Sequence, residues 1–242
     1  MSGSKTAKDG FQNEHDIVLL INEKCENFQK KIKEKTNTNP VSAHKVVGSP
    51  KTDLKIYHDT GCHNVSAKKF DKGASFNHLA RTNPEKFCKQ NNLNKTTYEV
   101  LSIFTGHISP SQRKHMLKDG VNPNVKRVLM SDIKDKYATA TLKDLQVNKN
   151  KIALWAFSGA NDEIDLFVFS QLDKQSGDKK HRCFSKEEVL KYYNTEIPIH
   201  ITKRGSIGFG NNITIQRKGG TGSPTNIQLK FKPHLIFEKA RQ

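Results

Sequence analysis

The chain has 242 residues, 34% of them hydrophobic and 27% charged, so it can bury a core as one large or two small domains and is not a disordered tail. Its 41 Lys and Arg residues against 24 Asp and Glu residues give a net charge of +17, which favours a polyanion such as nucleic acid as partner over a small-molecule substrate. No apolar run approaches the ~20 residues of a membrane span, and the first residues lack the apolar core of a signal peptide. We therefore expect a cytoplasmic protein without membrane contact.

From Phe11 to Ile32, apolar residues recur at three- and four-residue steps, which predicts one long amphipathic helix. Glu14 falls on the apolar face of this helix. A carboxylate there is costly unless it is paired or coordinates something. We interpret Glu14 either as an acid that supports a metal site or as an ordinary acid near the helix start, where the helix dipole favours it. The polar residues 37–51 contain two prolines and a glycine and predict a loop.

The stretch 52–68 predicts two short strands, 54–57 and 64–68, joined by a tight turn. Asp53 opens the first strand and Lys68 ends the second. A phosphodiester nuclease needs a carboxylate that holds a divalent metal and a cation that positions or activates the attacking water. Asp53 and Lys68 can supply both at one point, although a surface hairpin with a solvated lysine fits the same pattern.

The arrangement of Asp53 with Ser66-x-Lys68 resembles the motif of the PD-(D/E)XK nuclease superfamily, with Ser66 where most members carry a carboxylate. His58, Cys62 and His63 crowd the same hairpin, but a fourth zinc ligand at suitable spacing is absent. The four cysteines form no C-x-x-C pair, which indicates free thiols rather than a zinc ribbon or a disulfide framework.

The middle of the chain predicts helices that back the sheet, followed by a lysine-rich helical connection between two halves. The expected helical stretches are 76–90, broken at Pro84, then 97–104, stopped by Gly106, then 111–118 and 125–145. Two apolar runs, 152–157 and 164–169, predict a buried hairpin with Trp155 in the core. Ser185 and Glu188 form a capping-box pattern that predicts the start of the next helix.

Residues 213–218 and 227–232 alternate apolar and polar side chains, which predicts two strands with one buried and one polar face. Residues 200–242 contain eight Lys or Arg residues and one Glu, so this polar face is basic. Gln pairs with adenine and Arg with guanine at base edges, and glycines allow the backbone to approach a groove. A solvated lysine face with an ordinary Gly-Gly turn is the alternative. The residues expected to contact DNA are Arg204, Gln216, Arg217, Lys218, Gly219, Gly220, Lys230 and Lys232.

Two long segments, Gly3 to Ile17 and Arg204 to Gly220, resemble the corresponding segments of GCGC-cutting type II restriction endonucleases of the HinP/MspI kind. The FTG sequence at Phe104 to Gly106 adds a shorter match. The resemblance implies a Mg²⁺-dependent enzyme that cuts double-stranded DNA at a short GC-rich palindrome. It also implies a small unit, a monomer or weak dimer.

The same resemblance maps Asp53 and Lys68 onto the catalytic acid and lysine. Ser66 maps onto a position held by Gln in one relative and by Asn or Glu in others, and the loop between acid and lysine is shorter here, which leaves the number of metal ions open. We expect Asp53, Ser66, Lys68 and Glu14 in the catalytic group, and Mg²⁺ at Asp53, Ser66 and Ala67.

The expected fold is α/β (α+β), with a PD-(D/E)XK-type central mixed sheet flanked by helices and a C-terminal β-rich part that recognises DNA. We expect a catalytic core at 1–110, a helical connection at 111–150 and the recognition part at 151–242, or one continuous domain. Two other functions fit the sequence: a non-catalytic nucleic-acid-binding protein on a decayed nuclease fold, and a structure-selective repair or RNA nuclease. Products of incubation with plasmid and Mg²⁺ would separate the three.

Overall fold

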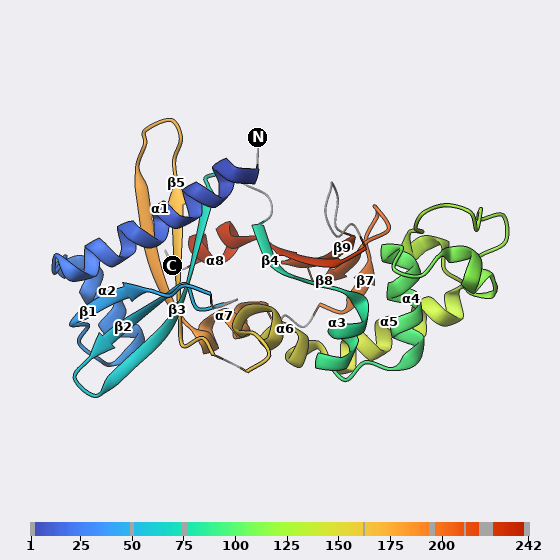
Figure 1. The fold of residues 1–242 in the computed structure, drawn as a ribbon, viewed down its shortest axis with the longest axis horizontal. Coiled ribbons are helices and arrows are strands. Elements are labelled where there is room, and N and C mark those ends of the chain that lie inside the picture. The colour runs from blue at the N-terminus through green and yellow to red at the C-terminus, as the bar shows by residue number, and fades with distance from the viewer. Residues whose placement is uncertain are drawn as a thin grey trace. The chain divides into compact units, whose positions relative to one another are not determined.

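The structure is a computed structural model that describes residues 3–48, 51–73, 77–161, 163–193, 197–210, 212–217 and 225–239 (Figure 1). The chain forms two compact units. Unit 1 comprises Met1–Ser75, Phe157–Tyr192 and Pro233–Gln242, and unit 2 comprises Phe76–Ala156 and Tyr193–Lys232. The two units are thus interleaved along the chain and differ from the three successive segments expected from the sequence. Every helix in the described ranges is too short or too polar to cross a membrane.

Unit 1 is built on a five-stranded mixed sheet. Its strands, in spatial order, are β1 (Ser42–Lys45), β2 (Leu54–His58), β3 (Gly61–Asp71), β5 (Leu166–Leu172) and β6 (Lys179–Ser185). Neighbouring strands are antiparallel, except that β3 and β5 run parallel. The helices of this unit are α1 (Gly3–Asn22), α2 (Glu26–Thr36), α7 (Lys186–Tyr193) and α8 (Pro233–Lys239). A mixed sheet flanked by helices confirms the expected fold class.

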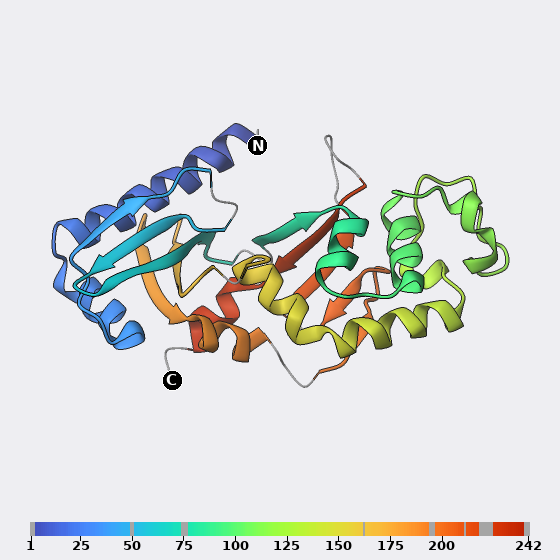
Figure 2. The same cartoon turned by 60° about the horizontal axis from the view of Figure 1, so that its bottom comes forward.

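The helices α1 and α2 cover one face of this sheet, and Figure 2 shows α7 and α8 on the other side. Ile17 and Ile21 of α1 and Ile32 of α2 are fully buried against Val65 and its neighbours on the sheet. The sequence predicted one helix here, but the chain breaks at residues 23–25, where Lys24 adopts a positive φ of 55°. The helix axis changes direction at this break, and the apolar side chains of both helices are nevertheless buried on the same face of the sheet.

The opposite face of the sheet carries an aromatic core. Phe167 lies edge-on to Phe157 at the end of α6 (Lys149–Ser158), with ring centroids 5.8 Å apart. Phe70 lies edge-on to Phe237 of α8 at 5.4 Å. The prediction of a strand over 152–157 was wrong, because a short, continuously apolar run does not distinguish a buried strand from a buried helix.

Unit 2 contains a second, antiparallel sheet packed with helices. Its strands, in spatial order, are β4 (Asn77–Thr82), β10 (Ile227–Phe231), β9 (Ile213–Arg217), β8 (Ile207–Phe209) and β7 (Ile199–Ile201). Its other elements are α3 (Pro84–Gln90), α4 (Lys95–Thr105), η1 (Pro110–Met116), η2 (Met130–Asp132) and α5 (Asp135–Val147). Trp155 is half-buried rather than enclosed, and its Nε1 donates to Gln90 Oε1 at 2.9 Å.

Several local predictions are confirmed. Gly106 ends α4 with a φ of 78°. Ser185 and Glu188 form the capping box before α7, with Ser185 N donating to Glu188 Oε2 at 2.9 Å and Glu188 N to Ser185 Oγ at 3.3 Å. Three other predictions were wrong: the expected loop contains β1, residues 77–82 form β4 rather than a helix, and residues 125–134 are largely irregular. In the case of β4, pairing with the distant β10 overrides the local pattern.

Candidate active site and nucleic-acid interface

Three donors from β3 converge on one oxygen of Asp53, directly before β2. Asp53 Oδ2 accepts from Ser66 Oγ at 3.1 Å, from Ala67 N at 2.7 Å and from Lys68 Nζ at 3.2 Å. The antiparallel register of β2 and β3 produces this geometry, since Asp53 N also donates to Val65 O at 2.9 Å. The structure therefore brings together the four residues that the sequence singled out here for catalysis and metal binding, Asp53, Ser66, Ala67 and Lys68.

The group is open on one side and closed on the other. The Asp53 and Lys68 side chains are 24% and 23% exposed, whereas Ser66 is fully buried. Ser66 of the central strand β3 pairs in register with Phe167 of its parallel neighbour β5, and this places the hydroxyl above the aromatic core. A carboxylate and an ammonium thus face solvent from a rigid base, as a site for a phosphate group requires.

Lys51 adds a second cation that the sequence interpretation missed. Burial, and after it the charge of Lys68, lowers the pKa of Lys51 to about 7, while the carboxylate of Asp53 acts in the opposite direction. Gly159, with a φ of +90°, leaves room for this side chain, because a Cβ there would lie 3.1 Å from Lys51 Cγ. Its position two residues before Asp53 is the signal in the sequence that could have identified it.

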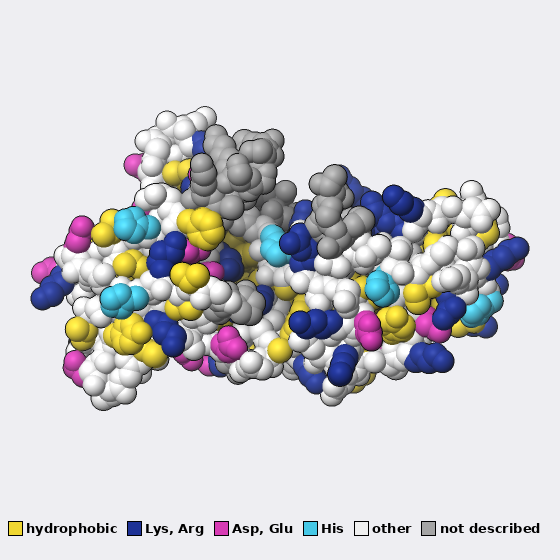
Figure 3. All heavy atoms as spheres, in the orientation of Figure 1, with side chains coloured by type: hydrophobic (Ala, Val, Ile, Leu, Met, Phe, Trp, Pro, Cys, Tyr) yellow, Lys and Arg dark blue, Asp and Glu magenta, His cyan; other side chains and the backbone are white. Residues whose placement is uncertain are grey.

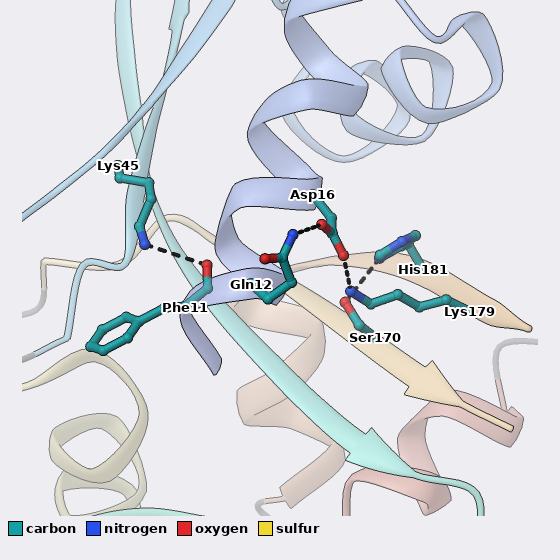
Figure 4. A network of polar contacts seen from close by, with 7 residues as sticks. All are labelled: Phe11, Gln12, Asp16, Lys45, Ser170, Lys179 and His181. Carbon is teal, nitrogen blue, oxygen red and sulfur yellow. Dashed lines mark hydrogen bonds and ion pairs between the residues drawn. The ribbon is translucent and has the colours of Figure 1, made fainter. Parts of the chain in front are cut away.

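Glu14 lies on the other face of this sheet. It pairs with Lys45 of β1 at 3.0 Å, and Lys45 also donates to Phe11 O at 3.4 Å (Figure 4). Lys45 is opposite Leu54 in the sheet, on the face covered by α1, whereas Asp53 shares the opposite face with Ser66. The structure therefore does not place Glu14 beside Asp53 as expected, because its carboxylate pairs with Lys45 on the sheet face that α1 covers.

The histidines of the hairpin tip interact with each other and with a threonine. The rings of His58 and His63 stack with centroids 4.6 Å apart, and His63 Nε2 lies 3.0 Å from Thr38 Oγ1. Burial, and then the charge of His58, lowers the pKa of His63. In the part of the chain that the structure describes, no three His, Cys, Asp or Glu side chains are grouped to hold a metal ion.

The sheet of unit 2 presents two polar cross-strand rows on one face. The first row joins Arg81, Gln228 and Gln216, which are opposite one another on β4, β10 and β9. The second row contains His78, Lys230, Thr214, Gly208 and His200. The intervening residues Ile213, Ile215, Ile227, Leu229 and Phe231 are buried, which confirms the predicted alternation. We call these two rows the polar face.

A β-bulge explains how β4 contributes two basic side chains to the polar face. The register of β4 and β10 shifts between Leu229 and Lys230, so that His78 and Arg81 both point outward although they are three residues apart. Because the sequence analysis expected a helix here, it did not identify His78 and Arg81 as candidate DNA contacts. The Gln216 side chain is held by a hydrogen bond from its Nε2 to Thr214 Oγ1 at 3.0 Å.

The other predicted DNA contacts are distributed differently. Arg217 has the same parity as Ile215 and points to the buried side of the sheet, where its guanidinium lies 5.6 Å from the centre of the Phe104 ring. Arg204 is exposed in the turn between β7 and β8, and Lys232 is half-buried after β10. Lys218, Gly219 and Gly220 lie outside the described residues.

The surface turned to the viewer in Figure 3 carries many Lys and Arg side chains and fewer Asp and Glu side chains. This distribution matches the net charge of +17. A surface of this kind attracts a polyanion over distances of about 10 Å at moderate salt.

No protein-family model and no curated protein matches the chain. Among solved structures, the restriction endonuclease MspI in complex with its cognate DNA is similar, with a TM-score of 0.53 over 85% of this chain and 77% of that chain. The sequence identity is 14%, so the likeness concerns the fold. The chain therefore has a restriction endonuclease-like fold.

Proposed function

We propose that this protein is a type II restriction endonuclease that makes Mg²⁺-dependent double-strand cuts in DNA at a short GC-rich palindrome, GCGC, and that it acts as a monomer. The observation that carries the proposal is the convergence of Ser66, Ala67 and Lys68 on Asp53 Oδ2. The fold shared with MspI, which was solved with its cognate DNA, supports DNA as the substrate. The choice of GCGC rests on the sequence resemblance of the two terminal segments.

The residues present fit Mg²⁺. This ion prefers oxygen ligands and is commonly held by one or two carboxylates together with waters and substrate phosphates. Asp53 offers a partly exposed carboxylate, and the Ser66 hydroxyl lies on the same oxygen at 3.1 Å. The Asp53 carboxylate, the Ser66 hydroxyl and the backbone carbonyl oxygen of Ala67 would hold the ion, which would neutralise charge that develops on the scissile phosphate.

Lys68 supplies the cation of the proposed reaction. Its ammonium lies 3.2 Å from Asp53 Oδ2 and has three donor hydrogens, so it can keep the contact with Asp53 while it orients a water or a phosphate oxygen. Burial of the Ser66 side and the aromatic core beneath it keep this group in place. Positioning of this kind is the main contribution of protein side chains to phosphoryl transfer.

The polar face of unit 2 is the proposed site of sequence reading. Gln216 and Gln228 pair across β9 and β10, with Arg81 next to them on β4. Amide and guanidinium groups can each form two hydrogen bonds to one base edge, and this gives discrimination between bases.

The proposal is tested by incubating the protein with plasmid DNA and Mg²⁺ and sequencing the ends of the products. We expect discrete double-strand fragments with ends in GCGC. Asp53→Asn and Lys68→Ala should abolish cleavage and leave DNA binding nearly intact, because the carboxylate and the ammonium contribute to the chemical step and not to the affinity for the duplex.

Glu14→Gln is the matched control, since it removes a carboxylate from the other face of the same sheet. This variant should cut at the wild-type rate. Binding without any cleavage by the wild type would favour a decayed nuclease, and single-strand or RNA products would favour a repair or RNA nuclease. Wild-type cleavage by Asp53→Asn would contradict the proposed site.

A further inference from the structure

The segment Lys126–Met130 of unit 2 is fixed between two glycines, although only its last residue belongs to a regular element. At Gly106, a Cβ would lie 2.5 Å from Lys126 O and 3.3 Å from Arg127 Cβ. At Gly205, a Cβ would lie 2.8 Å from Leu129 Cβ. Both glycines have positive φ, of 78° and 70°. The backbone of the segment can approach α4 and the β7–β8 turn this closely only because both positions lack a side chain.

Hydrogen bonds tie the same segment to three elements. Val128 N donates to Ile103 O of α4 at 3.4 Å, and Met130 N donates to Gly205 O in the β7–β8 turn at 2.9 Å. Arg217 at the end of β9 donates from Nη1 to Val128 O at 3.3 Å. An irregular segment held from α4, β9 and the β7–β8 turn has little freedom left, so its exposed side chains have a defined spacing.

The side chains that gather here are basic. Lys126 is exposed at one end of the segment, and Lys203 and Arg204 are exposed in the β7–β8 turn that the segment contacts. Arg127 and Arg217 are half-buried and close enough to repel one another. Burial, and after it the charge of Arg127, lowers the pKa of Arg217, while Asp132 acts in the opposite direction.

This charge pattern is unfavourable for the free protein. Asp132, the acid that offsets Arg217, already accepts a hydrogen bond from Leu129 N at 2.7 Å. Beside this pair, the exposed side chains of Lys126, Lys203 and Arg204 present three positive charges to solvent, and a polyanion is the ligand that such charges attract. A row of phosphates is such a polyanion, and the strand register puts the β7–β8 turn, with Lys203 and Arg204, at the same end of the sheet as Gln216.

We propose that Lys126, Lys203 and Arg204 form a clamp that binds the sugar-phosphate backbone of DNA beside the polar face. Arg217 is a positioning residue in this arrangement, because it holds Val128 from the buried side of the sheet. The clamp therefore sets the register of the duplex on Gln216 and Gln228 and reads no base itself. This proposal rests on the proposed function, since it assigns part of the DNA contact.

The test measures binding of the full-length protein to a GCGC duplex and to a scrambled duplex over a range of salt concentrations, in the Lys68→Ala background so that the DNA stays intact. Lys126→Ala and Lys203→Ala should each weaken binding to both duplexes alike and lower the salt slope by about 0.9, as expected for one lost phosphate contact. Lys143→Ala, an exposed lysine of α5 beside Pro198 at the other end of β7, is the matched control and should keep the wild-type slope.

Gly205→Ala separates geometry from charge. It removes no cation, but its Cβ would displace Leu129 and with it the segment, so the slope should fall here too. Wild-type slopes in Lys126→Ala and Lys203→Ala, together with a lowered slope in Lys230→Ala, would overturn the clamp and leave the proposed function standing. A parent protein that binds neither duplex would overturn the proposed function itself.

Discussion

At the scale of a single residue, Ser66 bears on the metal requirement of the proposed reaction. Its buried hydroxyl donates to Asp53 but brings no charge, so the proposed site holds Mg²⁺ with few anionic ligands. We expect wild-type cleavage to saturate only at millimolar Mg²⁺. Ser66→Asp should lower the Mg²⁺ concentration for half-maximal cleavage, and Ser66→Ala should raise it. Equal Mg²⁺ titrations of cleavage for the three proteins would show that Ser66 lies outside the metal site.

His181 makes the stability of unit 1 depend on pH. Its Nδ1 lies 2.8 Å from Ser170 Oγ, beside the Lys179–Asp16 ion pair that joins β6 to α1 (Figure 4). Burial lowers the pKa of His181 from 6.5 to about 4, so the unfolded chain binds a proton that the folded chain does not bind between these values. The stability that neutral His181 contributes is therefore fully present above pH 6.5 and falls towards pH 4, by about 3 kcal/mol.

The measurement is urea unfolding of the wild type and His181→Gln across this pH range. Glutamine keeps a polar group near Ser170 but does not titrate. The variant should lose less stability on acidification than the wild type. Parallel pH curves would exclude His181 as the cause of acid sensitivity.

At the scale of elements, the end of α4 provides a test of close backbone packing. Gly106→Ala introduces both an unfavourable positive φ, at a cost of about 1–2 kcal/mol, and a Cβ in contact with Lys126 O. Gly120→Ala carries the same φ cost, since its φ is +82°, but has open space around the Cβ. In urea unfolding, Gly106→Ala should lose at least about 1 kcal/mol more than Gly120→Ala. Equal losses would mean that the segment moves aside freely.

The two rows of the polar face should separate affinity from specificity. Lys230→Ala should weaken binding to all DNA sequences and lower the salt slope by about 0.9. Gln216→Ala should instead relax discrimination at one base position, at a cost of about 1–3 kcal/mol for the preferred base. Binding assays with single-base variants of GCGC measure both effects. A Gln216→Ala variant that changes only the salt slope would place base reading elsewhere.

Elements whose determinants are local follow from the sequence. The turn before Gly61 and the alternation around Ile215 and Leu229 predict both hairpins, and the Asp53–Lys68 geometry follows from the first of them. By contrast, the partner of β4 among the described strands is β10, more than a hundred residues later, so its own six residues carry a weak signal. Lys51 and Arg81 were missed for the same reason. The surroundings of Lys51 include Gly159, and Arg81 lies opposite Gln228 of β10, so both depend on residues far away in the sequence.

For the whole molecule, composition predicts a basic protein with a substantial core, but not how the chain is divided. The boundaries at Phe76, Phe157, Tyr193 and Pro233 arise because β3 pairs with β5 and β4 with β10 across long insertions. Periodicity reports which face of an element is buried and contains no information about which distant element buries it. The expected successive domains assumed that neighbouring segments of the chain belong to the same unit, whereas each of the two units combines segments that are far apart in the sequence.

The parallel pairing of β3 with β5 also orders events during synthesis. The Asp53–Lys68 hairpin leaves the ribosome early, but the strand that flanks β3 begins at Leu166, after most of unit 2 has been made. An isolated hairpin is marginally stable in water, and pairing over such a separation forms slowly. A polypeptide that stops before Leu166 thus cannot complete the sheet beneath Lys68. If the proposed endonuclease function is correct, truncated products of translation should be unable to cut DNA, whatever DNA-binding surface they retain.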